Sequence, residues 1–251
     1  MRIEGATALV TGASAGLGAA SARALYERGA RVAALDLEAD RTAARADDRW
    51  LPLTADVASA SSVDAAFDRV ADQWEAPSVV IHCAGVAGGF RLLGQDGPIA
   101  PERFEQVVRV NLFGTFHVLR AAAWHMSRRD EIASERGVIV TTSSIAAFEG
   151  QQGQLAYSAS KAGVVGMLLP AARELAALGV RCVSIAPGAF ATQLTTELPA
   201  TLQGQLVESA AFPRRLGRAD EFADLACAVV TNQMLNAEVI RLDAGARLPA
   251  R

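Results

Sequence analysis

Lysine is nearly absent from this chain of 251 residues: one of the 24 basic residues is Lys161, and the other 23 are arginine. Tyrosine is almost as scarce, and one of the two tyrosines, Tyr157, precedes Lys161 by four positions. Side chains at this spacing share one face of a helix. Because a guanidinium does not replace a compact ammonium, a chain that otherwise uses arginine is predicted to need the ammonium here. The alternative interpretation is a solvated surface lysine.

An excess of basic residues is also missing. The chain has 24 basic and 27 acidic residues, a net charge of −3, and its arginines are scattered along the sequence. The sequence therefore shows no basic stripe of the sort that nucleic-acid binding requires. Cysteine is scarce, and the wide spacing of Cys83, Cys182 and Cys227 predicts reduced core thiols, with neither a disulfide framework nor a zinc site. The three histidines lack metal-ligand spacing, so we expect no bound metal.

Long hydrophobic runs are missing as well. The apolar stretches are too short, or too interrupted by glycine, to cross a bilayer. The first apolar run, residues 6–10, follows the start of the sequence almost at once, which leaves no room for a secretory leader. The sequence therefore predicts a cytoplasmic protein without membrane contact.

The chain does contain short apolar runs, rich in Val and Ile, that alternate with longer amphipathic segments. Such runs are typical of parallel strands buried on both faces, and the repeated alternation indicates a doubly wound α/β sheet. We predict a single domain over residues 1–251, with a mainly parallel seven-stranded sheet and helices on both faces. Strands are predicted at about 7–12, 32–36, 50–56, 78–85, 137–144, 180–188 and 238–243, and helices at 15–28, 59–74, 101–127, 152–178 and 219–231.

Two segments interrupt the alternation. Residues 88–101 are polar and broken by Gly and Pro, which predicts a loop. Residues 190–216 follow a Pro-Gly pair and contain a weakly helical stretch. Both follow strand ends, where open α/β sheets bind ligands. Because long loops inside compact domains are often functional, we predict a substrate lid at about 188–216, with a plain connector as the alternative.

A glycine-rich turn, T-G-A-S-A-G-L-G at residues 11–18, lies between the first predicted strand and helix. Glycines there permit a tight turn, and the helix N-terminus offers N–H groups to a pyrophosphate. Asp36 ends the second strand, where a carboxylate accepts hydrogen bonds from ribose hydroxyls and repels a 2′-phosphate. No basic residue replaces Ser14 or Ala15, and a leucine follows Asp36, so the sequence predicts NAD rather than NADP.

Later strand ends complete the predicted cofactor site. Asp56 and Val57 end the third strand, where they are placed to pair with the adenine ring. A turn of small residues after the fourth strand lets the backbone pass close to the adenosine ribose, and a Pro-Gly turn after the sixth is placed to hold the nicotinamide carboxamide. The predicted cofactor-binding residues are Gly12, Ser14, Gly16, Leu17, Gly18, Asp36, Asp56, Val57, Cys83, Ala84, Gly85, Tyr157, Lys161, Pro187, Gly188, Phe190 and Thr192.

A polar set suited to proton transfer follows the fifth strand. Ser144 ends that strand, and Tyr157 and Lys161 lie on the next predicted helix. A phenol with a pKa of about 10 is a poor base at neutral pH, and a nearby ammonium lowers that pKa. Ser144 is predicted to bind the substrate oxygen, and Tyr157 to exchange its proton. Asn111 is predicted to hold a water that connects Lys161 to solvent. Taken singly, these residues have structural alternatives, such as a turn serine or an asparagine at a helix kink.

In their order along the chain, these motifs resemble the short-chain dehydrogenase/reductase family. The resemblance covers essentially the whole chain and implies a Rossmann-type domain, a homotetramer and a catalytic set made of the four polar residues above. The matching motifs are T-G-A-S-A-G-L-G, Asp36, C-A-G, Asn111, Ser144, Y-S-A-S-K and P-G-x-x-x-T.

The chain departs from the family pattern at His82 and Cys83, where the family more often has two asparagines. The missing amides alter how that strand is held, but they remove no catalytic group.

A narrower likeness lies in four stretches of the second half. They resemble the type II 3-hydroxyacyl-CoA dehydrogenases, a branch also known for 17β-hydroxysteroid activity, which uses NAD to oxidise the 3-hydroxyl group of acyl-CoA esters. The likeness implies that Gln154 lies beside the substrate, together with the serine and the tyrosine of the catalytic set. The four stretches are residues 146–161, 165–176, 212–217 and 237–244.

The 88–101 loop departs from that branch, which carries a basic insertion where this chain has only Arg91. Arg214 and Arg215 are candidates for contacts with CoA phosphates, and a solvated pair is the alternative.

These observations predict an NAD-dependent oxidoreductase that interconverts a secondary alcohol and a ketone, with a 3-hydroxyacyl-CoA as the first candidate substrate. A hydroxysteroid, a bulky alcohol or a carrier-bound 3-hydroxyacyl chain are alternatives within the same class. A non-catalytic NAD-binding scaffold protein is the alternative from another class, because a fold does not determine a function.

Overall fold

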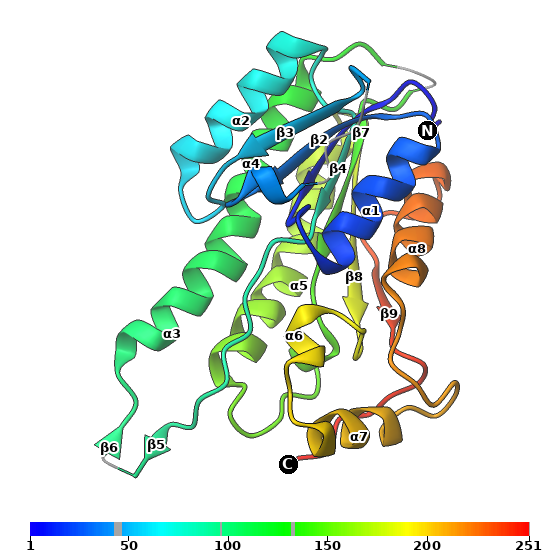
Figure 1. Ribbon diagram of the computed structural model, residues 1–251. Helices are drawn as coiled ribbons and strands as arrows, with labels where there is room; N and C mark the ends of the chain where they lie inside the picture. The colour runs from blue at the N-terminus through cyan, green and yellow to red at the C-terminus, as the bar shows by residue number, and fades with distance from the viewer. Residues whose placement is uncertain (43–46, 96, 132–133, 251) are drawn as a thin grey trace.

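Seven parallel strands form the centre of the computed structural model, which describes residues 1–42, 47–95, 97–131 and 134–250 (Figure 1). Their order across the sheet is β3-β2-β1-β4-β7-β8-β9, and all neighbours pair in parallel. This order confirms the predicted seven-stranded α/β fold. The strands are β1 (Thr7–Thr11), β2 (Arg31–Asp36), β3 (Trp50–Thr54), β4 (Val79–His82), β7 (Gly137–Thr142), β8 (Val180–Pro187) and β9 (Val239–Leu242).

Helices cover both faces of the sheet, because each strand sends successive side chains to opposite faces. In β1, Val10 belongs to the core on the side of α1 and α8, whereas Leu9 belongs to the core on the other side. The central strands are mostly apolar because both of these cores must be filled. The helices are α1 (Gly16–Glu27) and α8 (Ala219–Thr231) on one face, and α2 (Ala60–Gln73), α4 (Gly114–Ser127) and α5 (Leu155–Ala176) on the other (Figure 1).

The chain leaves the two central strands β1 and β4 toward opposite faces. After β1 it enters α1, and after β4 it runs to the helices on the other face. Neighbouring strands whose connections diverge in this way leave a crevice at their carboxyl ends, and ligands of open α/β sheets bind there. The topology therefore places the candidate site between β1 and β4.

The predicted helix over 101–127 is present, but its middle is a π-helical turn. Pro101 starts α3 (Pro101–Val108), a position where its missing N–H is not needed. The π turn, η2 (Arg109–Phe113), then joins α3 to α4 and contains Asn111. Such turns often occur at functional sites, and this one turns the Asn111 side chain into the interior.

The two interrupting segments contain short elements. The predicted loop over 88–101 carries a small antiparallel pair, β5 (Leu93–Gly94) and β6 (Gly97–Pro98), while residue 96 lies outside the described residues. The segment after β8 carries two helices on the lower side of Figure 1. No helix in the described part of the chain is long and apolar enough to cross a membrane. The remaining elements are α6 (Gln193–Thr196), α7 (Ala200–Glu208) and the short helices η1 (Ala39–Arg41) and η3 (Ile145–Ala147).

Candidate active site

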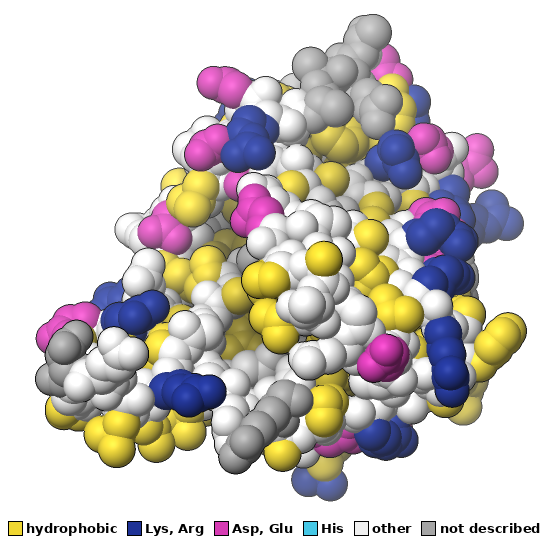
Figure 2. All heavy atoms as spheres, turned by 60° about the horizontal axis from the view of Figure 1, so that its bottom comes forward, with side chains coloured by type: hydrophobic (Ala, Val, Ile, Leu, Met, Phe, Trp, Pro, Cys, Tyr) yellow, Lys and Arg dark blue, Asp and Glu magenta, His cyan; other side chains and the backbone are white. Residues whose placement is uncertain are grey.

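Two connected cavities lie at the edge of the sheet where the strands end. The first, of about 480 Å³, is lined by the glycine-rich turn, Asp36 and Asp56. The second, of about 370 Å³, is lined by Ser144, Tyr157 and Lys161. Figure 2 brings this side of the molecule forward and shows a recess with hydrophobic side chains along it. The two cavities form one cleft because they share Leu17, Cys83, Gly85, Val86 and Thr192 in their linings.

The glycine-rich turn forms a cradle that only glycine allows. Gly12 has a φ of +68°, and a Cβ added to it would stand 2.9 Å from the backbone nitrogen of Ala84. A Cβ at Gly18 would overlap the carbonyl oxygen of Gly12. No side chain caps the start of α1, and its first turn holds no acidic residue, so its N–H groups face the cavity without a competing acceptor. This cradle fits the pyrophosphate of a dinucleotide.

Asp36 lies at the end of β2 beside this cradle. Its carboxylate accepts hydrogen bonds from the backbone nitrogens of Ser14 at 3.0 Å and Leu37 at 2.8 Å, one at each oxygen. These bonds hold the carboxylate in place and leave lone pairs for ribose hydroxyls. The Leu37 side chain, 65% exposed, offers no positive charge to a 2′-phosphate.

His82 replaces the expected asparagine by joining the two central strands. The hydroxyl of Thr11 accepts hydrogen bonds from the nitrogens of Cys83 and Ala84, both at 3.1 Å, and lies 2.7 Å from Nδ1 of His82. Burial lowers the pKa of His82 to about 3, and the charge of Lys161 acts in the same direction. The imidazole is therefore neutral. Because the Thr11 hydroxyl already accepts two hydrogen bonds, its own hydrogen is available to Nδ1 of His82.

The three polar residues predicted for proton transfer line the second cavity together. Ser144 accepts a hydrogen bond from the nitrogen of Ala146 at 3.1 Å, which leaves its own hydrogen free to donate. Lys161 is 5% exposed and donates from Nζ to the carbonyl oxygen of Thr142 at 2.8 Å. Its Nζ stands 5.8 Å from the ring centroid of Tyr157. The helix spacing does bring the phenol and the ammonium to one cavity.

The expected lowering of the Tyr157 pKa is wrong for this structure. Burial raises the pKa of Tyr157, and hydrogen bonding with Ser144 only partly opposes it. The ammonium points at the Thr142 carbonyl oxygen and not at the phenol. Burial also lowers the pKa of Lys161 to about 8, which Cys83 slightly counteracts. Desolvation is therefore the largest cause of the pKa shift at both groups.

Asn111 lies behind the cleft and not in its lining. It is fully buried; its Oδ1 accepts from the nitrogen of Val86 at 2.8 Å, and its Nδ2 donates to the carbonyl oxygen of Val86 and to Ser160 Oγ. A Cβ added at Gly85 would lie 3.1 Å from Asn111 Oδ1 and 3.5 Å from Lys161 Nζ. A side chain at position 85 would therefore press on Asn111 and contact Lys161. The part of Asn111 in the catalytic set stays a prediction.

All the predicted cofactor-binding residues line the two cavities, as do Ser144 and Gln154. Arg215 is not available as a phosphate ligand, because it forms a two-pronged ion pair with Glu221. Arg91 lines a neighbouring cavity, and Arg214 is exposed. Sequence reasoning missed Gln151, a glutamine in the Q-Q-G-Q motif, and the further lining residues Val86, Thr142, Leu198 and Leu206, which no motif marks.

The cradle and the polar set together define a dinucleotide-dependent oxidoreductase. The model of the short chain dehydrogenase family matches residues 6–203, and the chain belongs to this family. It is therefore an oxidoreductase that acts on CH–OH groups, in a family that uses NAD or NADP.

Relatives are similar over nearly the whole chain. The 3-hydroxyacyl-CoA dehydrogenase type-2 of Bos taurus is 42% identical over 98% of this chain and 97% of that protein. The (3R)-3-hydroxyacyl-CoA dehydrogenase of Homo sapiens is 36% identical over 89% of this chain and 88% of that protein. A crystal structure of 3-hydroxyacyl-CoA dehydrogenase type-2 from Mycobacterium avium has a TM-score of 0.92 and 36% identity, with 98% of both chains covered.

The burial of Lys161 predicts a pH-dependent stability. Its pKa is about 8 in the folded protein against an ordinary value of 10.5, so between these values the unfolded chain binds more protons and the free energy of unfolding rises with pH. We expect Lys161→Met to be more stable than the native protein at pH 7 by about 2 kcal/mol. The pKa difference contributes roughly 3 kcal/mol, and the lost hydrogen bond to Thr142 offsets about 1 kcal/mol.

Urea unfolding of both proteins, followed from pH 7 to pH 10.5, measures this difference. The advantage of the variant should shrink as the pH rises, because the native lysine is then neutral in the folded state and increasingly loses its charge in the unfolded state as well. Equal stability of the two proteins at pH 7 would contradict the prediction.

Proposed function

We propose that the protein is an NAD-dependent dehydrogenase that interconverts 3-hydroxyacyl-CoA and 3-oxoacyl-CoA. The observation that carries the proposal is the joint lining of one cavity by Ser144, Tyr157 and Lys161, continuous with the dinucleotide cradle. The names of the relatives support the substrate class.

Oxidation of a secondary alcohol removes a proton from its oxygen and a hydride from its carbon. When bound, NAD accepts the hydride. Tyr157 takes the proton, and Ser144 donates a hydrogen bond to the substrate oxygen as it becomes a carbonyl. Lys161, held by the Thr142 carbonyl oxygen, keeps a positive charge beside both groups. Asn111 fixes Val86 and thereby the wall between the two cavities.

NAD is proposed over NADP because of the charge at Asp36. Its carboxylate is held by two backbone nitrogens and lies in the lining of the first cavity. A 2′-phosphate placed there would meet a negative charge and no described basic residue of that lining.

The segment 188–216 is proposed as a substrate lid on the domain formed by residues 1–251. Its two ends are joined, because the nitrogen of Ala191 donates to the Gly217 carbonyl oxygen at 2.8 Å and the Gly217 nitrogen donates to the Ala189 carbonyl oxygen at 2.9 Å. Between these ends α7 contains no buried residue. A segment with fixed ends and a lightly packed middle is suited to open and close.

The cytoplasm is proposed as the compartment.

A homotetramer is proposed from an exposed apolar stripe. Phe113, Phe116 and Trp124 follow one side of η2 and α4 and are 50 to 56% exposed, and Leu169 of α5 is 43% exposed. Large apolar side chains along two neighbouring helices are typical of surfaces that are covered by another subunit.

The proton-transfer roles predict the effects of two substitutions. Tyr157→Phe should lower kcat for 3-hydroxybutyryl-CoA by about 10³, since the proton acceptor is removed. Lys161→Arg should lose most activity although it keeps the charge, because the guanidinium does not fit the ammonium position. Since burial raises the pKa of Tyr157, the native rate of oxidation should rise with pH through the neutral range. Steady-state kinetics with NAD measures all three effects.

Calorimetric titration with NAD is the control for these variants. If the native protein binds NAD tightly and oxidises no alcohol, the scaffold alternative holds; if Tyr157→Phe keeps full activity, the proposed role of the phenol is wrong.

The charge at Asp36 predicts the choice of cofactor. The native protein should prefer NAD over NADP by about 100-fold in kcat/KM, since like charges in contact cost several kcal/mol. The double variant Asp36→Ser with Leu37→Arg should reduce this preference to below about tenfold. Asp56→Ser, in the same cavity, is the matched control and should weaken both cofactors alike. An unchanged preference in the double variant would refute the role of Asp36.

The exposed stripe predicts the native mass. Light scattering should give about four times the chain mass of 26.2 kDa. Trp124→Glu should lower this mass because it places a charge in the covered surface. Met234→Glu is the control, as this methionine is 90% exposed and lies outside the stripe. A native monomer would rule out the assembly.

A further inference from the structure

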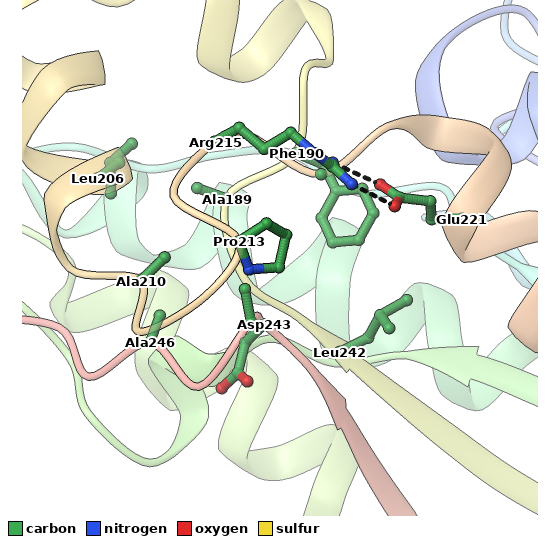
Figure 3. A pocket seen from close by; sticks show the side chains of 12 residues that line it. Ala189, Phe190, Leu206, Ala210, Pro213, Arg215, Glu221, Leu242, Asp243 and Ala246 are labelled. Atoms are coloured by element: carbon green, nitrogen blue, oxygen red, sulfur yellow. Dashed lines mark hydrogen bonds and ion pairs between the residues drawn. The ribbon is translucent and has the colours of Figure 1, made fainter.

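A third cavity, of about 220 Å³, lies behind the lid segment, and of the predicted cofactor-binding residues it is lined by Phe190 alone (Figure 3). Its walls come from the start of the lid, from the end of α7 and from the chain after β9. The lining residues that matter for what it binds are apolar: Ala189, Phe190, Leu206, Ala210, Pro213 and Ala246.

The charged residues around this cavity are already paired. Arg215 donates two hydrogen bonds to the carboxylate of Glu221, at 2.8 and 2.6 Å, as Figure 3 shows. The Asp243 carboxylate points away from Pro213 in the same view and accepts hydrogen bonds from Arg241 and from the Gly245 nitrogen. A ligand therefore meets no free charge there, and an uncharged apolar group fits the cavity best.

Phe190 forms a firm wall of the cavity. Its ring packs edge-on against Phe222 with centroids 6.4 Å apart, and it fills the space beside Gly217, where an added Cβ would lie 2.7 Å from the ring. Leu206 of α7 also lines both this cavity and the second one, and it is a partly buried side chain on the lightly packed lid helix.

The cavity adjoins the cleft. Ala189, Phe190 and Leu206 line both this cavity and the one that holds Ser144 and Tyr157. On its other side the second cavity meets a fourth one, of about 410 Å³, whose lining combines four glutamines and Arg91 with apolar side chains. The glutamines are Gln151, Gln152, Gln154 and Gln205, and the apolar residues include Phe90, Leu198 and Leu202. The cavity of the reacting centre thus has two neighbours, which we call the apolar branch and, for its four glutamines, the amide-rich branch. Leu206 lines all three cavities.

We propose that the apolar branch binds the alkyl tail of the acyl thioester, and that the tail reaches it past Leu206. The amide-rich branch then takes the pantetheine arm, whose amides match the glutamine side chains. This inference rests on the proposed function, and it extends that function by assigning a preference for medium-length chains. Liquid water takes about 30 Å³ per molecule. If one methylene group needs about the same volume, the branch of about 220 Å³ holds roughly seven such groups.

The test compares four 3-hydroxyacyl-CoA esters as substrates with NAD: 3-hydroxybutyryl-CoA, 3-hydroxyhexanoyl-CoA, 3-hydroxyoctanoyl-CoA and 3-hydroxydecanoyl-CoA. For the native protein kcat/KM should rise with chain length, by up to about fourfold per methylene group until the branch is full. Ala210→Leu places three more carbon atoms in the branch. It should lower kcat/KM for the octanoyl and decanoyl esters by at least about tenfold, with less than about twofold change for the butyryl ester, which is too short to reach the branch.

Ala200→Leu is the matched control, because it makes the same change at an exposed position on the same lid helix. Ala246→Leu narrows the branch from the opposite wall and serves as a second variant should Ala210→Leu fail to fold. NADH affinity and the thermal unfolding midpoint check that each variant is folded.

A flat chain-length profile in the native protein overturns the tail site, as does an unchanged profile in a folded branch-filling variant. Absence of turnover with every thioester, the butyryl ester included, refutes the proposed function itself. The two failures are therefore distinguished by the short substrate.

Discussion

The hydrogen bonds of the Thr11 hydroxyl hold the ends of β1 and β4 together, and the rest of the site depends on this junction. Here the connections after β1 and β4 diverge to opposite faces, and the strand ends must stay close while a crevice opens in front of them. Thr11 ties β1 to the nitrogens of Cys83 and Ala84 and to the ring of His82. The close approach of Gly12 to Ala84 follows from this junction. The cradle, and the wall between the two cavities, are built on it.

The chemistry of the site has a cost in stability. An ammonium with 5% exposure and one carbonyl partner is poorly compensated for its lost water, and its pKa falls to about 8. Burial also raises the pKa of the neighbouring phenol. The pair thus places groups with shifted pKa values beside the reacting centre, and sites of this kind are common where function opposes stability.

The fold and most of the site were predictable because their signals are local. Apolar runs, helix periodicity and glycines at strand ends each identify an element or a turn, and parallel strands place all their carboxyl ends on one edge. The π turn at Arg109–Phe113 and the short pair β5 and β6 were not predicted, since neither leaves a pattern in the sequence. The pKa of Tyr157 was predicted in the wrong direction because its burial depends on residues distant in the chain.

By itself the sequence determined the order of the elements, the cradle and the identity of the polar residues. Each of these follows from the type of a residue and from its nearest neighbours in the chain. Only the tertiary structure decided that Asn111 stands behind the cleft and that Arg215 forms an ion pair with Glu221. It also decided that Leu206 lines the apolar branch, the amide-rich branch and the cavity of the reacting centre. These outcomes depend on which side chains meet across the folded chain, because burial and partners, not spacing, govern where a charge or an apolar group is stable.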